Sequence, residues 1–127
     1  MNQGKILMAA GIYGFLAVVL GAFGTHSLKN LLDPSSLQIF DVGVKYQMYH
    51  ALALGFVAAL AQPSLTKHLK KAALFFSIGI AIFSGSLYIL VATQVRVLGA
   101  ITPIGGGLLI VGWFFLILEG WDRSQSK

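Results

Sequence analysis

Four long apolar runs follow one another along the chain, and they limit its possible folds more than any other feature. They cover residues 6–24, 44–61, 72–92 and 101–118. A helix needs roughly 20 apolar residues to cross the bilayer core, and open strands cannot span lipid because their edges stay unpaired. The sequence therefore predicts an all-α fold, an integral membrane four-helix bundle in one domain over residues 1–127. The predicted helices cover about 6–26, 35–61, 70–92 and 102–120.

The composition supports a lipid environment. Hydrophobic residues make up 57% of the 127 residues and charged residues only 10%, whereas soluble domains are about a quarter charged. The net charge of +5 does not indicate a nucleic-acid partner, because the basic residues are not clustered among aromatic ones. The chain has no cysteine, which excludes disulfides, thiolate catalysis and cysteine-based metal sites.

The distribution of basic residues predicts the topology. With four spans, the N-terminus, the second loop and the C-terminus share one side of the membrane. That side holds Lys5, Lys67, Lys70, Lys71, Arg123 and Lys127, and the other side holds Lys29, Lys45 and Arg96. The positive-inside rule then places both termini in the cytoplasm, giving an N-in/C-in multi-pass protein. The basic cluster at residues 67–71 is interpreted as a topology signal in preference to a lipid head-group site.

Two proline-containing segments indicate where helices begin. Asp33 is predicted as an N-cap with Pro34 at the first helical position, and Thr102-Pro103 is a second start of this kind. A helix over residues 34–61 would be about 42 Å long, which exceeds the bilayer core. Its first turns are predicted to tilt or to lie along the interface. Whether it breaks at Gly43 stays open. Asp41 and Lys45, four residues apart, predict a local ion pair.

Small residues are spaced for close helix packing. The first run carries Ala10, Gly14, Ala17, Gly21 and Gly24 along one face. Helices in lipid associate by close backbone approach at such residues. Tight packing within one chain is the favoured interpretation. The alternative is that one stripe faces a second copy or a partner membrane protein.

Polar side chains gather in the predicted outer half of the bundle, and the inner half has almost nothing comparable. The candidate binding residues are His26, Lys45, Gln47, Tyr49, His50, Ser84, Ser86, Tyr88 and Thr102. Because buried polar groups in lipid need partners, these residues are expected to face one another inside the bundle.

Three interpretations of this cluster remain open. The favoured one is structural hydrogen bonding, the second is a binding pocket or pore vestibule, and the third is catalysis or haem ligation by His26 and His50. The central part of each run lacks Asp and Glu, which disfavours proton-coupled export unless His50 carries the proton. We predict no catalytic residue, no metal and no cofactor, and hence a protein that is not an enzyme.

Four motifs together resemble a known family. They are GAFGTHSL at 21–28, YQMYHALA at 46–53, FSGSLY at 83–88 and ITPIGG at 101–106. The chain resembles, over essentially its whole length, the small membrane protein family called domain of unknown function 423. Family members often have Ala where this chain has Thr25 and Ser27. The resemblance implies four helices in a bacterial plasma (inner) membrane, and it carries over no biochemical activity.

The sequence thus leaves two classes of function. The first is an accessory or scaffold subunit of a larger membrane complex, favoured by the small size and the small-residue stripes. The alternative is a homo-oligomeric channel or transporter for a small solute, with its polar site in the outer half of the bundle. The expected partners are the lipid bilayer together with a second copy or another membrane protein, and no nucleic acid.

Overall fold

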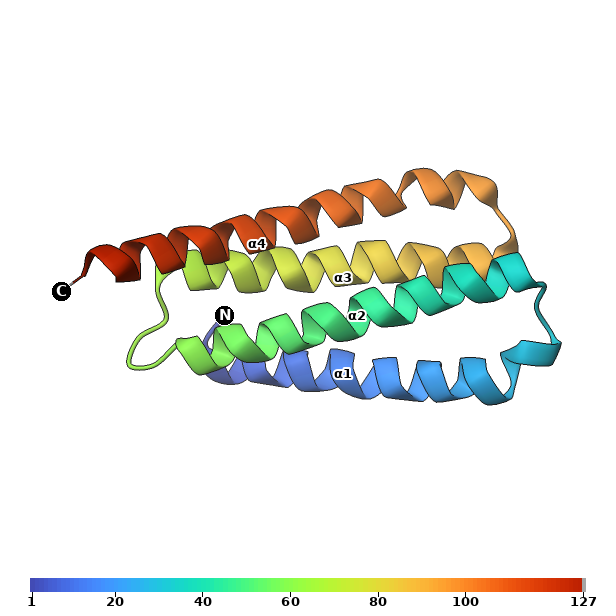
Figure 1. Ribbon diagram of the computed structural model, residues 1–127, viewed down its shortest axis with the longest axis horizontal. Coiled ribbons are helices and arrows are strands. Elements are labelled where there is room, and N and C mark those ends of the chain that lie inside the picture. The colour runs from blue at the N-terminus through green and yellow to red at the C-terminus, as the bar shows by residue number, and fades with distance from the viewer. Residues whose placement is uncertain (127) are drawn as a thin grey trace.

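Four long helices make up nearly all of the protein. The structure, a computed structural model, describes residues 1–126. The elements in chain order are α1 (Gln3–His26), the short 3-10 helix η1 (Leu28–Asn30), α2 (Pro34–Leu60), α3 (Lys67–Thr93), the 3-10 helix η2 (Arg96–Ala100) and α4 (Thr102–Gln125). The long helices lie side by side and alternate in direction, so the N-terminus and the C-terminus lie at the same end (Figure 1). We call this the terminal end and the opposite one, with η1 and η2, the loop end. The prediction of an all-α fold is confirmed.

Capping side chains determine where three of the helices begin. Asp33 accepts a hydrogen bond from the Ser36 backbone N at 3.3 Å, which confirms it as the N-cap of α2. Hydrogen bonds from Ser36 also hold the pKa of Asp33 below its usual value. Asn2 and Thr66 cap α1 and α3 in the same way, so both helices begin three residues before the predicted positions. The sequence analysis placed these starts by hydropathy, which does not register a polar cap.

The predicted cap of α4 is wrong. Ile101 occupies the N-cap position, and no side chain caps the helix. Thr102 is already helical, and its hydroxyl oxygen lies 2.6 Å from Oγ of Ser86 on α3. The Thr102 hydroxyl also lies 3.4 Å from the backbone oxygen of Leu98, so it contacts the preceding turn and a neighbouring helix and does not accept from the first N–H groups of α4.

Helix α2 is continuous through Gly43, which answers the question that the sequence left open. The Tyr88 ring packs against this glycine, and a Cβ added there would lie 2.8 Å from Cε1 of Tyr88. The missing side chain at Gly43 therefore allows α2 and α3 to approach closely.

The four helices differ in how well they suit a membrane. Three segments, Gln3–His26, Lys67–Thr93 and Arg96–Gln125, are long and apolar enough to cross one by themselves. Helix α2 has 27 residues, but its stretch from residue 41 to residue 50 carries Asp41, Lys45, Gln47 and His50. Figure 1 shows α2 between α1 and α3, which pack on either side of it. Neighbouring helices therefore cover much of the most polar helix.

The apolar core lies toward the terminal end of the bundle. Its largest fully buried side chains include Ile6, Leu54, Leu69, Phe76 and Ile80, which come from α1, α2 and α3. The main packing contacts join α1 to α2, α2 to α3 and α3 to α4. Helices α1 and α4 are therefore the outer members and expose most of their apolar side chains.

Candidate functional site

Gln47 links three helices near the middle of the bundle. Its side chain is buried, and its Nε2 donates to the backbone oxygen of Tyr13 on α1 at 2.9 Å. Its Oε1 accepts a hydrogen bond of 2.7 Å from the hydroxyl of Tyr88 on α3. One turn away, Ser84 donates to the backbone oxygen of Gly43 at 2.7 Å. These polar groups therefore use one another as partners, and α1, α2 and α3 are joined through Gln47.

His50 forms a second connection, between α2 and α4. Its Nε2 accepts a hydrogen bond of 3.0 Å from the indole Nε1 of Trp113. Its Nδ1 lies 2.7 Å from the backbone oxygen of Tyr46. A carbonyl can only accept, so this arrangement assigns the hydrogen to Nδ1 and leaves Nε2 with the lone pair that accepts from Trp113. To carry a proton or bind haem iron through Nε2, the imidazole would have to give up its bond to Trp113.

Ser86 and Thr102 form a third group, at the loop end of the α3–α4 pair. Their hydroxyl oxygens are 2.6 Å apart, and the Ser86 hydroxyl also donates to the backbone oxygen of Phe83 at 2.9 Å. This group, like the other two, connects helices.

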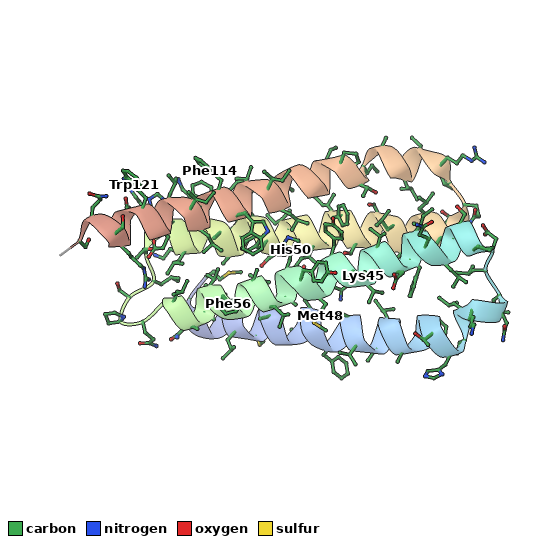
Figure 2. All side chains as sticks on the ribbon, in the orientation of Figure 1. Lys45, Met48, His50, Phe56, Phe114 and Trp121 are labelled. Carbon is green, nitrogen blue, oxygen red and sulfur yellow. The ribbon has the colours of Figure 1, made fainter. Side chains whose placement is uncertain are left out.

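The remaining candidates are not in the interior. His26, Lys45 and Tyr49 lie on the exposed surface. Lys45 pairs with Asp41 at 2.8 Å, which confirms the predicted i,i+4 ion pair. Figure 2 shows Lys45 along α2, on a different side from His50, which faces α3 and α4. Of the nine candidates, the structure thus brings six into three hydrogen-bonded groups and leaves three at the surface.

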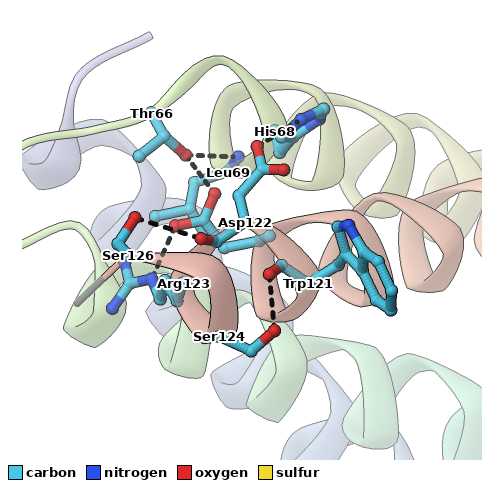
Figure 3. Close-up of polar contacts among 9 residues, drawn as sticks. Thr66, His68, Leu69, Trp121, Asp122, Arg123, Ser124 and Ser126 are labelled. Carbon is cyan, nitrogen blue, oxygen red and sulfur yellow. Dashed lines mark hydrogen bonds and ion pairs between the residues drawn. The ribbon is translucent and has the colours of Figure 1, made fainter.

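A polar network at the terminal end was missed by the sequence analysis. The side chain of Glu119 is only 4% exposed, and its carboxylate accepts hydrogen bonds from Thr66 at 2.5 Å and from Nε of Arg123 at 2.7 Å. Arg123 also donates to the backbone oxygen of Leu60 at 2.7 Å. These contacts join α4 to α2 and to the start of α3 (Figure 3). The expectation that this half offers nothing comparable is therefore wrong. The sequence did contain one sign of this network, because Glu119 and Arg123 stand four residues apart, a spacing that favours an ion pair along a helix.

His68 lies beside this network. Its Nε2 is 3.2 Å from a carboxylate oxygen of Asp122, and its ring stacks on Phe115 with centroids 6.0 Å apart. Among residues 1–126, Nδ1 of His68 is the one buried side-chain nitrogen or oxygen without a hydrogen-bond partner. A pocket of about 340 Å³ opens here, lined by residues that include Thr66, His68 and Arg123.

Two further hollows lie along one seam between α1 and α2, which we call the α1–α2 groove. The apolar hollow, of about 420 Å³, is lined by Ala10, Gly14, Met48, Ala51, Leu52, Gly55, Phe56 and Ala59. The polar hollow, of about 320 Å³, is nearer the loop end and is lined by Gly21, Gly24, Thr25, Lys29, Leu37, Phe40, Asp41 and Val44. None of the nine candidate residues lines either hollow. Within residues 1–126, no three His, Cys, Asp or Glu side chains are grouped to hold a metal ion.

These features define a small helical membrane protein with an internally hydrogen-bonded interior. The chain belongs to the family described as "Protein of unknown function (DUF423)", whose model matches residues 20–106. The resemblance noted from the motifs is thereby confirmed.

Relatives from several bacteria match nearly the whole chain. It is 45% identical over 116 residues to "UPF0382 membrane protein YwdK" of Bacillus subtilis, covering 90% of this chain and 94% of the relative. It is 39% identical over 124 residues to a "UPF0382 membrane protein" of Haemophilus influenzae, covering 98% of each. It is 34% identical over 127 residues to "UPF0382 inner membrane protein YgdD" of Escherichia coli, covering 100% of this chain and 96% of the relative. No solved structure matches the chain significantly.

Proposed function

We propose that the protein is a non-enzymatic accessory or scaffold subunit of a larger complex in the bacterial plasma membrane. The observation that carries this proposal is the pairing of the interior polar groups. Gln47, His50 and Ser84 bind other groups of the same chain, and the hollows found in residues 1–126 are lined by other side chains. Hydrogen bonds of this kind hold helices together and leave the outer surface of the bundle to meet a partner.

The proposed topology has four spans with both termini in the cytoplasm. The shared position of the termini at one end is in keeping with an even number of crossings (Figure 1). The six basic residues predicted on that side, against three on the other, support the N-in orientation. In this arrangement α2 crosses with Gln47 and His50 bonded to α1, α3 and α4, while its Asp41–Lys45 ion pair stays exposed in the loop-end half.

Single cysteines test the topology directly, because the native chain has none. We expect Ser64→Cys and Ser126→Cys to react with a membrane-impermeant maleimide only after the cells are opened. Ser27→Cys and Gly99→Cys, at the loop end, should react in intact spheroplasts. If Ser27→Cys and Ser64→Cys react from the same side, α2 does not cross the membrane and the proposed topology is wrong.

The accessory role is tested by native mass spectrometry of the protein extracted gently from its own membrane at natural expression. We expect a mass that includes a foreign subunit in fixed proportion. A mass that contains only this chain, as one or more copies, would count against the proposal.

The homo-oligomeric channel or transporter has less support from the geometry. A solute path would need polar groups that face an open space. Gln47 instead forms hydrogen bonds with Tyr13 and Tyr88, and His50 forms them with Tyr46 and Trp113. Liposome flux measurements distinguish this alternative. It would be supported by a flux through the wild-type protein that Gln47→Ala and His50→Ala abolish.

A further inference from the structure

We infer that two copies of the chain pair in the membrane through one exposed face of α2. We call it the polar face, and it consists of Gln38, Asp41, Lys45 and Tyr49. A second copy is a partner beyond the accessory role, because it binds whether or not a foreign subunit is also present. The pairing depends on the proposed four-span topology, in which α2 crosses the membrane.

The polar face is a single line of exposed side chains along α2. Its four positions follow one another at intervals of three or four residues, which brings them to one side of the helix. Lys45 and Asp41 pair at 2.8 Å, and their side chains remain 57% and 58% exposed. Tyr49 is 54% exposed, and Figure 2 shows Lys45 on a different side of α2 from His50. The other helices of the chain therefore leave this ion pair largely uncovered.

The ion pair lies at the depth of the hydrocarbon core. Helix α2 has 27 residues, so it is about 40 Å long, and the core is about 30 Å thick. When α2 is centred in the core, about 5 Å of the helix extends beyond each boundary. Asp41 and Lys45 follow Pro34 by seven and eleven residues, which puts their Cα atoms roughly 5 Å and 11 Å inside the loop-end boundary.

Lipid is a poor cover for charges at this depth. Ionisable side chains within membrane spans almost always face the interior of a protein assembly or a water-filled cavity. The segments 6–24, 72–93 and 97–118, which belong to the other three spans, contain no Asp, Glu, Lys or Arg. Exposed side chains there, such as Phe15 on α1 and Ile110 on α4, are apolar and suit lipid. The polar face is thus the part of the bundle surface that calls for a different neighbour.

A second copy supplies the complementary charges by symmetry. Two copies with the same topology are related by a two-fold axis along the membrane normal, so residues at the same depth meet. Asp41 of each copy then lies within about 6 Å in depth, roughly one helical turn, of Lys45 of the other. A carboxylate can accept from two ammonium groups, and an ammonium group has three hydrogens to donate. Two acids and two bases therefore form a closed group without net charge.

Other neighbours match this face less well. A foreign helix would have to carry charges of its own at the same depth, and each such charge makes its insertion less favourable. Water could reach the ion pair only if another protein kept the lipid away, because the face lies on the outside of the bundle. A second copy meets both requirements with residues that the chain already has.

Disulfide cross-linking in native membranes tests the pairing, because the chain has no cysteine of its own. Gln38→Cys and Tyr49→Cys lie at the two ends of the polar face and leave the ion pair intact. A disulfide needs Cα atoms within about 7 Å of each other, and we expect at least one of these variants to give a covalent dimer on mild oxidation.

Ile110→Cys on α4 is the matched control. Position 110 is 71% exposed, and it lies one turn from Trp113, which contacts His50 on α2 and so marks a similar depth. We expect this variant to remain a monomer under the same oxidation.

Charge reversal in the cross-linking variant tests the role of the ion pair. Asp41→Lys places four positive charges where the copies meet, and Lys45→Asp places four negative ones. Each alone should reduce the cross-link to the level of Ile110→Cys. Co-expressed with tags of different size, the two chains should form a mixed dimer. The exchange Asp41→Lys/Lys45→Asp should cross-link like its parent, because acid and base remain four residues apart. It also keeps the test decisive if a single reversal does not accumulate in the membrane.

Two results of these experiments would overturn the pairing. One is cross-linking of Gln38→Cys and Tyr49→Cys no higher than that of Ile110→Cys. The other is a dimer that forms equally well with either single charge reversal. Labelling of Ser27→Cys and Ser64→Cys from the same side would also overturn it, because the ion pair would then lie in water.

The native mass separates the pairing from the accessory role. Two copies together with a foreign subunit would support both. Two copies alone would support the pairing and count against the accessory role. One copy with a foreign subunit would support the accessory role and overturn the pairing.

Discussion

Glycines in the α3–α4 seam and in the terminal-end half of the α1–α2 seam meet very different neighbours. In the α3–α4 seam, a Cβ at Gly79 would lie 2.7 Å from the side chain of Leu109, and one at Gly112 would lie 2.6 Å from the ring of Phe76. At Gly105 the added atom would collide with the backbone of Phe83. In the terminal-end half of the α1–α2 seam, a Cβ at Gly14 would only touch Ala51, at 3.9 Å, and one at Gly55 would meet nothing within 4 Å.

The difference shows that a small residue can either close a seam or leave it open. Where a large side chain from the opposite helix fills the space, the helices pack tightly and the glycine becomes essential. Where the opposite position is also small, as Ala51 is opposite Gly14, the seam keeps a hollow that something outside the chain can fill. The variants below test this contrast.

The largest effect is expected for Gly105→Ala. Its methyl group would meet the Phe83 backbone, which cannot rotate away as a side chain can, so the helices must separate. Overpacking of this kind costs about 1–3 kcal/mol, and we expect the upper part of that range. Unfolding by denaturing detergent, followed by circular dichroism, measures the loss. Gly107→Ala, two residues along the same helix, has open space and should remain near wild type; equal losses would refute the contrast.

A smaller effect is expected for Gln47→Leu, which removes the hydrogen bonds that Gln47 makes to α1 and α3. The variant leaves the Tyr88 hydroxyl without its acceptor and removes the donor to the Tyr13 backbone oxygen. Hydrogen bonds between membrane helices contribute about 0.6 kcal/mol on average and up to about 1.7, so we expect about 1 kcal/mol. A double-mutant cycle with Tyr88→Phe in the same unfolding assay should show coupling. Strictly additive losses would mean that the two side chains do not interact.

Trp113→Phe is expected to cost about 0.6 kcal/mol, because it removes the indole donor to His50 and keeps an aromatic ring in place. The same assay measures it, with Trp121→Phe as the control at an exposed position. In the background of His50→Phe the effect of Trp113→Phe should disappear. Its persistence there would show that packing, and not the hydrogen bond, links α2 to α4.

Gly55→Ala should have the smallest effect, and its sign should be reversed. The new methyl group meets open space, and alanine favours the helix by up to about 1 kcal/mol relative to glycine. We expect stability equal to or slightly above wild type in the unfolding assay. A clear loss would mean that the terminal-end half of the α1–α2 seam is as tightly closed as the α3–α4 seam.

The sequence was informative about elements and less so about contacts between them. The long apolar runs located the helices, and Asp33 marked the start of α2, because both depend on residues that are close in the chain. Thr102 was expected both to start α4 as its cap and to face the other polar candidates, and the structure supports only the second role, through Ser86 on another helix. The spacing of Gly14 and Gly105 did not distinguish an open position from a closed one, since the opposite helix decides that.

The candidate site shows the same limit. The sequence pointed correctly to Gln47, His50 and Tyr88 as interior polar residues in need of partners. It did not identify Trp113 as the partner of His50, because an indole within an apolar run is also typical of packing. It overlooked Glu119, whose partner Thr66 is 53 residues away in the chain.

The polar stretch of α2 over residues 41–50 has a consequence for how the protein is made. As the chain leaves the ribosome, α1 emerges first, and its Tyr13 backbone oxygen can receive Gln47 as soon as α2 follows. Tyr88 and Trp113, the other partners of the α2 polar side chains, are synthesised only with α3 and α4. We therefore expect α2 to enter the bilayer as a hairpin with α1 and to be held securely there only when translation is nearly complete.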